Sequence, residues 1–253
     1  MGTALVTGAS AGLGEEFCWQ LAAAGHNLVI VARREERLRA IAHQIEQASG
    51  VGVEVIVADL ATPEDVERIA RRLDSVDQPV GLLVNNAGFG IGHPFLDGPI
   101  DAEITGLDVM VRATMILSYR AARAMFARGR GAILNVSSVA SDTGMGTYSA
   151  HKAWVKAFSE GLAEELRGTG VTVTAVMPGM MRTGFHDVTA IDPDTVHPIS
   201  WIDPEVVVDE ALAAVRRGQV LCTPTWRYKV TSALVKFAPR WAVRRVTSRI
   251  PHI

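Results

Sequence analysis

Hydrophobic and polar positions along this chain form two kinds of run in alternation. Short runs of β-branched and apolar residues predict buried strands, and longer runs with apolar residues every three or four positions predict amphipathic helices. The predicted strands cover residues 3–6, 27–32, 53–58, 81–84, 132–136, 171–177 and 219–222. The predicted helices cover residues 14–25, 34–48, 62–76, 100–128, a run that opens at Tyr148, and 204–217. This alternation predicts an α/β fold with a parallel sheet and helices on both of its faces.

Composition narrows the class of protein. The 253 residues are 48% hydrophobic and 21% charged, which is enough for a large buried core, and the net charge of -2 argues against a general nucleic-acid binder. Cys18 and Cys222 lie far apart in apolar runs and are expected to be reduced core residues, and the seven histidines show no metal-ligand spacing. Because the first strand begins at Thr3 and no apolar run is long enough to span a bilayer, we expect a cytoplasmic protein.

A glycine-rich segment, TGASAGLG at residues 7–14, lies between the first predicted strand and the first predicted helix. Glycines in that position permit a tight turn and close approach of the backbone to a ligand. The helix N-terminus then offers free N–H groups to a pyrophosphate. The alternative is that the glycines only form a turn, but the flanking strand and helix favour the phosphate site.

Arg33 and Arg34 follow the second predicted strand, about 20 residues beyond the glycines. An acidic residue there would bind the ribose 2'-hydroxyl of NAD, whereas arginine accommodates the 2'-phosphate of NADP. The sequence therefore favours NADP(H) over NAD(H). The alternative is that both arginines only begin the charged face of the helix that follows.

Residues 132–154 combine a strand end, two serines, a polar loop, and Tyr148 and Lys152 four residues apart at the start of a helix. A nearby ammonium lowers the pKa of a phenol, so such a tyrosine could exchange a proton with an alcohol or carbonyl oxygen. A serine hydroxyl from the strand end could bind the same oxygen. Taken alone, a tyrosine and a lysine at this spacing are more often ordinary surface residues of an amphipathic helix.

Two further segments remain. Residues 180–203 are predicted to be a long loop, and the apolar residues Met180, Met181, Phe185, Ile191 and Trp201 suggest a lid over a hydrophobic substrate. Residues 224–253 are amphipathic and basic, with no acidic residue. Such a segment could touch anionic lipid, but packing on the domain or on a partner subunit is the commoner outcome. We find no linker, and predict one domain over residues 1–253.

Six motifs together resemble the short-chain dehydrogenase/reductase family, in its single-domain branch. They are TGASAGLG (7–14), Asp59, NNAG (85–88), NVSS (135–138), YSAHK (148–152) and PGMMRT (178–183). The resemblance covers nearly the whole chain and implies a doubly wound, seven-stranded Rossmann sheet, a nicotinamide cofactor, and a homodimer or homotetramer.

The resemblance also implies roles for individual residues. Tyr148 would be the acid and base, Lys152 would lower its pKa and bind the nicotinamide ribose, and Ser138, the second serine of its pair, would hold the substrate oxygen. The cofactor contacts that we predict are Gly8, Ser10, Gly12, Leu13, Gly14, Arg33, Arg34, Asp59, Leu60, Asn86, Ala87, Gly88, Tyr148, Lys152, Pro178, Gly179 and Thr183. The expected function is an NADP(H)-dependent oxidoreductase that acts on a carbonyl/secondary-alcohol pair of a hydrophobic substrate.

Two departures from the family pattern suggest an alternative function. Met110 stands where the family commonly has a catalytic asparagine that helps to hold a proton-relay water, and a thioether is only a weak acceptor. The loop of residues 139–147 is about three residues shorter than usual and has Ser141 where glycine is common. The alternative function is a cofactor-binding protein with little turnover.

Overall fold

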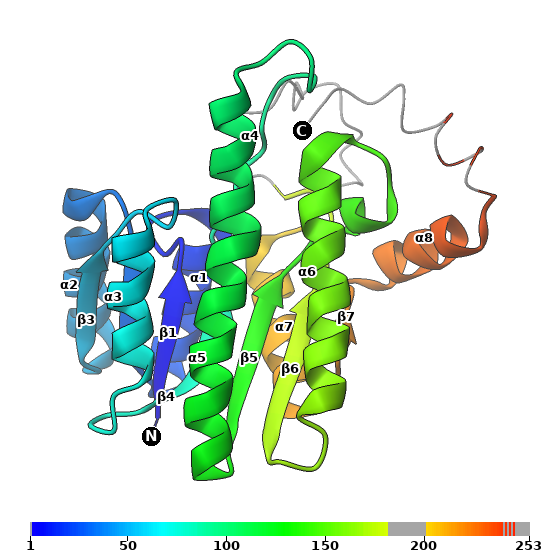
Figure 1. Ribbon diagram of the computed structural model, residues 1–253. Helices are drawn as coiled ribbons and strands as arrows, with labels where there is room; N and C mark the ends of the chain where they lie inside the picture. The colour runs from blue at the N-terminus through cyan, green and yellow to red at the C-terminus, as the bar shows by residue number, and fades with distance from the viewer. Residues whose placement is uncertain (1, 182–200, 240, 242, 244, 246–253) are drawn as a thin grey trace.

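The computed structural model describes residues 2–181, 201–239, 241, 243 and 245. One seven-stranded parallel sheet has the strand order β3-β2-β1-β4-β5-β6-β7 (Figure 1). The strands are β1 (Thr3–Thr7), β2 (Asn27–Ala32), β3 (Val53–Val57), β4 (Val80–Asn85), β5 (Gly131–Val136), β6 (Val171–Val176) and β7 (Leu221–Cys222). The predicted Rossmann sheet is confirmed. Its order reverses between β1 and β4, the place where ligands bind in such sheets.

Helices cover both faces of the sheet, as predicted, and each face has its own buried core. The helices on one face are α1 (Gly12–Ala23), α2 (Glu35–Ser49) and α7 (Pro204–Arg216). Those on the other face are α3 (Pro63–Leu73), α5 (Ala113–Arg128) and α6 (Gly146–Glu165). Figure 1 shows α3, α5 and α6 side by side in front of the sheet. Because strands between two helical layers are apolar on both sides, they appear in the sequence as continuous apolar runs.

The run predicted to be helical over residues 100–128 is helical throughout, but it is not one regular α-helix. The structure has α4 (Ile100–Leu107), a π-helical turn, η1 (Asp108–Arg112), and α5 without a gap between them. Buried positions continue through the turn at Val109 and Met110, so the apolar pattern that predicts a helix does not mark the interruption. Such π turns are frequent at functional sites, and this one contains Met110.

The bounds of several other segments also differ from the prediction. The last strand is only Leu221–Cys222, and a short 3-10 turn, η2 (Val139–Asp142), joins β5 to α6. Most of the predicted lid, including Thr183, Phe185 and Ile191, lies outside the described residues. The described part of the basic tail contains α8 (Trp226–Phe237). None of the helices in the described ranges combines the length and the apolar character that crossing a bilayer requires.

Candidate active site

A cavity of about 720 Å³ opens at the carboxyl ends of the strands, between the β1–α1 turn and the N-terminal part of α6. Every residue that we predicted for the site and that the structure describes lines this cavity; Thr183 lies outside the described residues. The structure therefore brings these residues together around one cavity.

The glycine-rich turn forms one end of the cavity. Gly8 has φ +68°, and a Cβ atom on Gly14 would lie 2.2 Å from the carbonyl oxygen of Gly8, so only glycine fits there. Asn86 closes the turn from β4, because its Nδ2 donates to the carbonyl oxygen of Thr7 at 2.9 Å. Among the described residues no side chain caps α1 at Ala11, so its first N–H groups face the cavity. A pyrophosphate fits this cradle of backbone donors.

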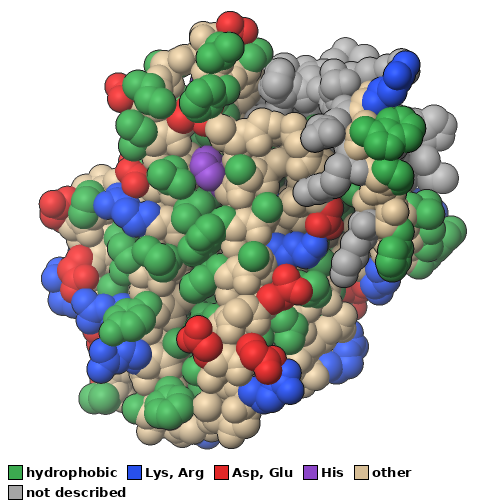
Figure 2. Space-filling model, turned by 45° about the vertical axis from the view of Figure 1, so that its right-hand side comes forward, with side chains coloured by type: hydrophobic (Ala, Val, Ile, Leu, Met, Phe, Trp, Pro, Cys, Tyr) green, Lys and Arg blue, Asp and Glu red, His purple; other side chains and the backbone are tan. Residues whose placement is uncertain are grey.

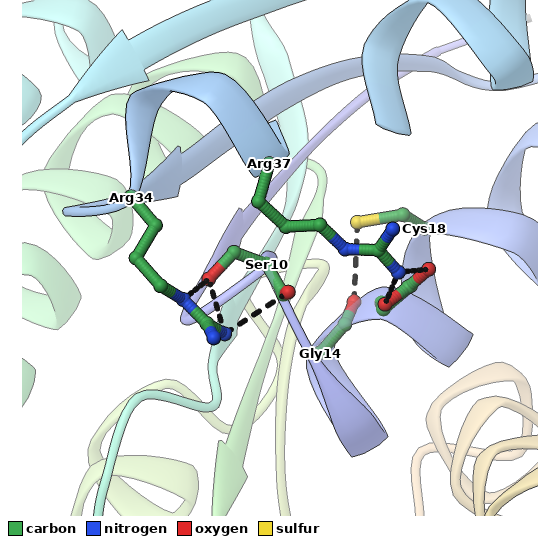
Figure 3. A network of polar contacts seen from close by, with 6 residues as sticks. Ser10, Gly14, Cys18, Arg34 and Arg37 are labelled. Atoms are coloured by element: carbon green, nitrogen blue, oxygen red, sulfur yellow. Dashed lines mark hydrogen bonds and ion pairs between the residues drawn. The ribbon is translucent and has the colours of Figure 1, made fainter. Parts of the chain in front are cut away.

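Arg34 lies over the same turn (Figure 3). Its Nη2 donates to the carbonyl oxygen and to the Oγ of Ser10, both at 3.1 Å, and its Nε donates to the same Oγ at 3.3 Å. The Arg33 side chain is 67% exposed, and its Nη1 lies 3.8 Å from a carboxylate oxygen of Asp59. Both guanidinium groups line the cavity, on the β2 side of the turn. They place two cations where a dinucleotide would have its adenosine ribose.

Figure 3 also shows Cys18 next to the turn. Its Sγ donates to the carbonyl oxygen of Gly14 at 3.1 Å inside the core. Cys18 and Cys222 are both free and buried, and burial raises the pKa of each thiol, that of Cys222 to about 11. Thiols held in the protonated form are poor nucleophiles.

The two serines after β5 have different partners. The Ser137 hydroxyl donates to the carbonyl oxygen of Lys152 at 2.7 Å and so ties β5 to α6. The Ser138 hydroxyl accepts a hydrogen bond from the N–H of Ala140 at 3.1 Å and also hydrogen-bonds Tyr148. Only Ser138 therefore has its hydroxyl beside the phenol in the cavity. This difference gives a physical reason for our choice of Ser138 over Ser137.

Tyr148 and Lys152 both lie in the first two turns of α6 and are almost fully buried, with 7% and 4% of their surface exposed. Burial raises the pKa of Tyr148 to about 12, against a lowering effect of the Ser138 hydrogen bond. Burial also lowers the pKa of Lys152 to about 8. In this structure the loss of hydration outweighs the expected lowering of the phenol pKa by the ammonium, because the Lys152 Nζ lies 5.7 Å from the centre of the tyrosine ring and donates to the carbonyl oxygen of Val136 at 2.8 Å.

Met110 lies beside Lys152, as its place in the family pattern requires. A Cβ atom on Gly88 would lie 3.2 Å from the Lys152 Nζ and 3.4 Å from the Met110 Sδ, so both side chains border the same point. Only 1% of the surface of Met110 is exposed. The group next to the ammonium is thus a thioether, which is only a weak hydrogen-bond acceptor and no donor.

Two polar residues behind Met110 are buried, which the sequence analysis did not predict, although one of them, His151, belongs to the YSAHK motif. Glu103 on α4 accepts a hydrogen bond from the Thr147 hydroxyl at 2.5 Å, and His151 follows Tyr148 by one helical turn. Burial lowers the pKa of His151, the charge of Lys152 adds to this effect, and the carboxylate of Glu103 opposes it. Glu103 lies 45 residues before Tyr148, and no motif connects them. The large apolar residues of this helix, Ile100, Ile104 and Leu107, are exposed, so its apolar pattern did not mark Glu103 as buried.

A buried chain of side-chain amides and hydroxyls, also unpredicted, joins the strands under the cavity. Asn85 donates to Ser118 at 3.0 Å and to Asn135 at 2.8 Å, and Asn135 donates to Ser159 at 2.9 Å. These groups connect β4 and β5 with α5 and α6. Because satisfied buried networks are rigid, this chain fixes the spacing between the strand ends and the helix that carries Tyr148.

The comparisons with known proteins agree with this geometry. The family model "short chain dehydrogenase" matches residues 2–192. A very-long-chain 3-oxoacyl-CoA reductase of Anas platyrhynchos is 34% identical over 209 residues, which are 79% of this chain and 66% of that protein. The chain thus spans about two thirds of that reductase.

Two solved structures are similar over nearly the whole chain. A short-chain dehydrogenase from Sphingobium yanoikuyae in complex with NADPH has 31% identity and a TM-score of 0.85, covering 95% of this chain and 97% of that one. A 7β-hydroxysteroid dehydrogenase has 28% identity and a TM-score of 0.87, covering 98% and 96%. With the matched family model, the parallel sheet and the shared cavity, these findings show that the chain belongs to the short chain dehydrogenase family.

Proposed function

We propose that this chain is an NADP(H)-dependent oxidoreductase that transfers hydride between the nicotinamide and a carbonyl/secondary-alcohol pair of a hydrophobic substrate. The observation that carries the proposal is the convergence of Ser138, Tyr148 and Lys152 on the cavity that also contains the glycine-rich turn. A proton donor and a dinucleotide cradle at one sheet edge are what a carbonyl reduction needs.

The three side chains have complementary tasks in this proposal. The bound cofactor supplies the hydride. Ser138 donates a hydrogen bond to the substrate oxygen, and Tyr148 donates the proton that this oxygen takes up on reduction. The raised pKa of Tyr148, about 12, keeps the phenol protonated at neutral pH, which is the form that reduction requires. Lys152 is the neighbouring cation from which the phenol regains a proton, and its lowered pKa of about 8 makes it an adequate donor.

The preference for NADP(H) is supported by the two arginines beside Ser10. Arg34 already lies within hydrogen-bond distance of the Ser10 hydroxyl, and Arg33 lies beside Asp59. A 2'-phosphate placed between them would gain charge-assisted hydrogen bonds. The similar dehydrogenase from Sphingobium yanoikuyae was solved with NADPH.

A hydrophobic substrate is supported by the wall on the Tyr148 side of the cavity. The apolar side chains there are Phe89, Val109, Met145, Met180 and Met181. Methionines adapt to large, irregular apolar ligands. Two similar proteins are named for a very-long-chain acyl substrate and for a steroid. We therefore propose a bulky apolar ketone or its alcohol.

The experiment that tests this function is NADPH oxidation against a panel of ketones and aldehydes of increasing bulk. We expect turnover with the bulky ketones, and a loss of about 10²- to 10⁴-fold in Tyr148→Phe because the proton donor is removed. The dissociation constant for NADPH should stay close to that of the wild type. Full turnover in Tyr148→Phe would show that another group transfers the proton.

A second candidate function, a cofactor-binding protein with little turnover, is favoured by Met110. Its buried thioether stands beside Lys152 and offers no proton path. This candidate requires tight NADPH binding without oxidation across the panel. Met110→Asn separates the two: a large gain in turnover supports an impaired relay, whereas an active wild type without a gain supports another water path.

We also infer that the protein forms a homo-oligomer. Large apolar side chains are exposed along α4 and α5, among them Leu107, Met115, Tyr119 and Phe126. A second copy that packs on this surface would remove it from water. Analytical ultracentrifugation of the wild type and of Tyr119→Ser with Phe126→Ser tests the inference, and a monomeric wild type contradicts it.

A further inference from the structure

The described residues leave the apolar side of the helix α8 uncovered. Trp226, Val230, Leu234 and Phe237 are 70%, 51%, 67% and 86% exposed. Their spacing of four, four and three residues places them on one side of the helix. Trp241, just beyond α8, is 65% exposed as well. We call the first four residues the α8 stripe. A helix of a globular domain normally turns such a stripe towards the core, so the α8 stripe is directed to something outside the domain.

Contacts on other sides of α8 hold it in this orientation. Glu210 on α7 accepts hydrogen bonds from the N–H of Thr225 at 3.0 Å and from the Lys229 ammonium at 3.2 Å. Thr225 has φ +64°, a conformation that β-branched residues rarely adopt and that the surrounding contacts must maintain. The first turn of α8 is therefore clamped to α7. Figure 1 shows that the helix then projects away from the sheet and its covering helices.

The charge of residues 224–253 indicates the chemistry of the surface that the α8 stripe would contact. Residues 224–253 contain seven of the 25 Lys and Arg residues and none of the 27 Asp and Glu residues. The segment thus has a charge of +7 in a chain whose net charge is -2. In Figure 2 hydrophobic side chains and Lys or Arg side chains lie next to one another at the right-hand edge of the molecule. An apolar stripe among cations fits a surface that is both apolar and anionic.

We propose that α8 is a membrane-surface anchor that binds the headgroup region of an anionic lipid bilayer. The α8 stripe enters the boundary between headgroups and acyl chains, and described basic side chains of α8 such as Arg227, beside Trp226, bind lipid phosphates and carboxylates. Tryptophan near each end of the apolar run suits this boundary, because one part of the ring is apolar and the N–H remains hydrated. Symmetrical packing of α8 on α8 of a second copy is disfavoured, because it would bring two segments of charge +7 together.

The same helix contacts the wall of the cavity. The Tyr228 hydroxyl accepts a hydrogen bond from the N–H of Met180 at 3.1 Å, and a Cβ atom on Gly179 would lie 2.2 Å from the Tyr228 ring. Gly179 and Met180 both line the cavity. A bilayer bound at α8 therefore lies next to this wall. If the proposed function is correct, an apolar substrate dissolved in lipid reaches the cavity from that side without crossing bulk water.

The experiment is co-sedimentation of the full-length protein with vesicles of equimolar phosphatidylcholine and phosphatidylserine, beside vesicles of phosphatidylcholine alone. We expect sedimentation with the anionic vesicles, weaker sedimentation with the neutral ones, and loss of binding as the KCl concentration rises. The test variant is Trp226→Ser with Leu234→Ser and Phe237→Ser. It should weaken binding to the anionic vesicles by at least about tenfold, because three inserted side chains are lost.

A matched control keeps the result specific. Val76→Ser with Leu96→Ser removes two apolar side chains that are 93% and 91% exposed outside α8, and should bind vesicles like the wild type. The NADPH dissociation constant of all variants, measured without lipid or substrate, reports correct folding. It also separates a failure of the anchor from a failure of the proposed function.

Two kinds of result would overturn the anchor. The first is a failed binding assay, in which the wild-type protein stays in the supernatant with anionic vesicles or the triple variant sediments like the wild type. The other is a triple variant that changes from oligomer to monomer in sedimentation velocity while the wild type does not bind vesicles, which would make the α8 stripe a subunit interface.

Discussion

The two ends of the cavity are built in different ways. At the β1–α1 end the surface consists of backbone groups, and the glycines matter because they have no side chain. Gly14 is required because any Cβ would meet the carbonyl oxygen of Gly8. At the β5–α6 end the surface consists of side chains whose pKa values are shifted by burial, to about 12 for Tyr148 and about 8 for Lys152. The first end depends on local chain geometry. The second depends on the layers of protein that exclude water from it.

The largest effect that would test this contrast concerns the two serines at the side-chain end. We expect Ser138→Ala to lower the turnover number by about 10²-fold or more, because it removes a donor to the reacting oxygen. Ser137→Ala should instead lower the free energy of unfolding, because its hydroxyl binds the carbonyl oxygen of Lys152. Steady-state kinetics and urea unfolding of both variants measure the difference. Equal rate losses would show that the two hydroxyls share one role.

Lys152 provides a pH test of burial at the same end. Because its pKa falls from 10.5 to about 8 on folding, the unfolded chain binds more protons than the folded one between these values. The contribution of Lys152 to the free energy of unfolding should therefore rise with pH from about 8 to 10, by up to about 3 kcal/mol. The raised pKa values of the Cys18 and Cys222 thiols act in the opposite direction above pH 9, as does that of Tyr148 above pH 10, so the contribution of Lys152 is read as the difference between the wild type and a variant that lacks the ammonium.

The comparison for this pH test is Lys152→Met, which should lack the rise. Urea unfolding at a series of pH values measures it. If the free energy of unfolding of the wild type changes with pH in parallel with that of Lys152→Met, the ammonium is hydrated. Burial would then not distinguish the β5–α6 end of the cavity from the β1–α1 end.

At the backbone end, Gly14→Ala should cost about 1 to 3 kcal/mol of stability, because the added methyl group forces the turn apart. NADPH binding should weaken with it. Gly161→Ala is the matched control: this glycine also lies in a helix, α6, but a Cβ there meets no atom within 4 Å. Alanine at that position should stabilise the protein by about 0.5 to 1 kcal/mol. Urea midpoints measure the stability and fluorescence titration measures NADPH binding. Equal values for the two variants would contradict the claim that the turn at Gly14 needs a glycine.

The smallest expected effect concerns the cation at the rim of that end. Arg34→Ala should weaken NADPH binding by about tenfold and leave NADH binding nearly unchanged, because only NADPH has the 2'-phosphate. Arg37→Ala is the control, since Arg37 pairs with Glu15 and does not line the cavity. Dissociation constants of both cofactors for both variants settle the matter. NADH that binds the wild type as tightly as NADPH would refute the preference.

Much of the fold and of the cavity wall followed from the sequence because the signals were local. Seven apolar runs predicted seven strands, and the motifs at their ends predicted residues that do line one cavity. The features that the sequence did not predict depend on contacts between distant segments or leave the apolar pattern unchanged. The π turn at Met110 keeps the apolar pattern intact, and Glu103 gains its buried position only when α4 packs on α6. The amide chain from Asn85 to Asn135 forms only when β4 and β5 pair.

The sequence by itself determined the order of strands and helices, the glycine-rich turn and the identity of the residues at the strand ends, because each depends on the period of apolar positions or on the conformational range of a few residues. Only the tertiary structure decided the protonation of Tyr148 and Lys152, the choice between two adjacent serines, and the outward direction of the α8 stripe. These depend on which atoms exclude or admit water, and that is settled by segments far apart in the chain.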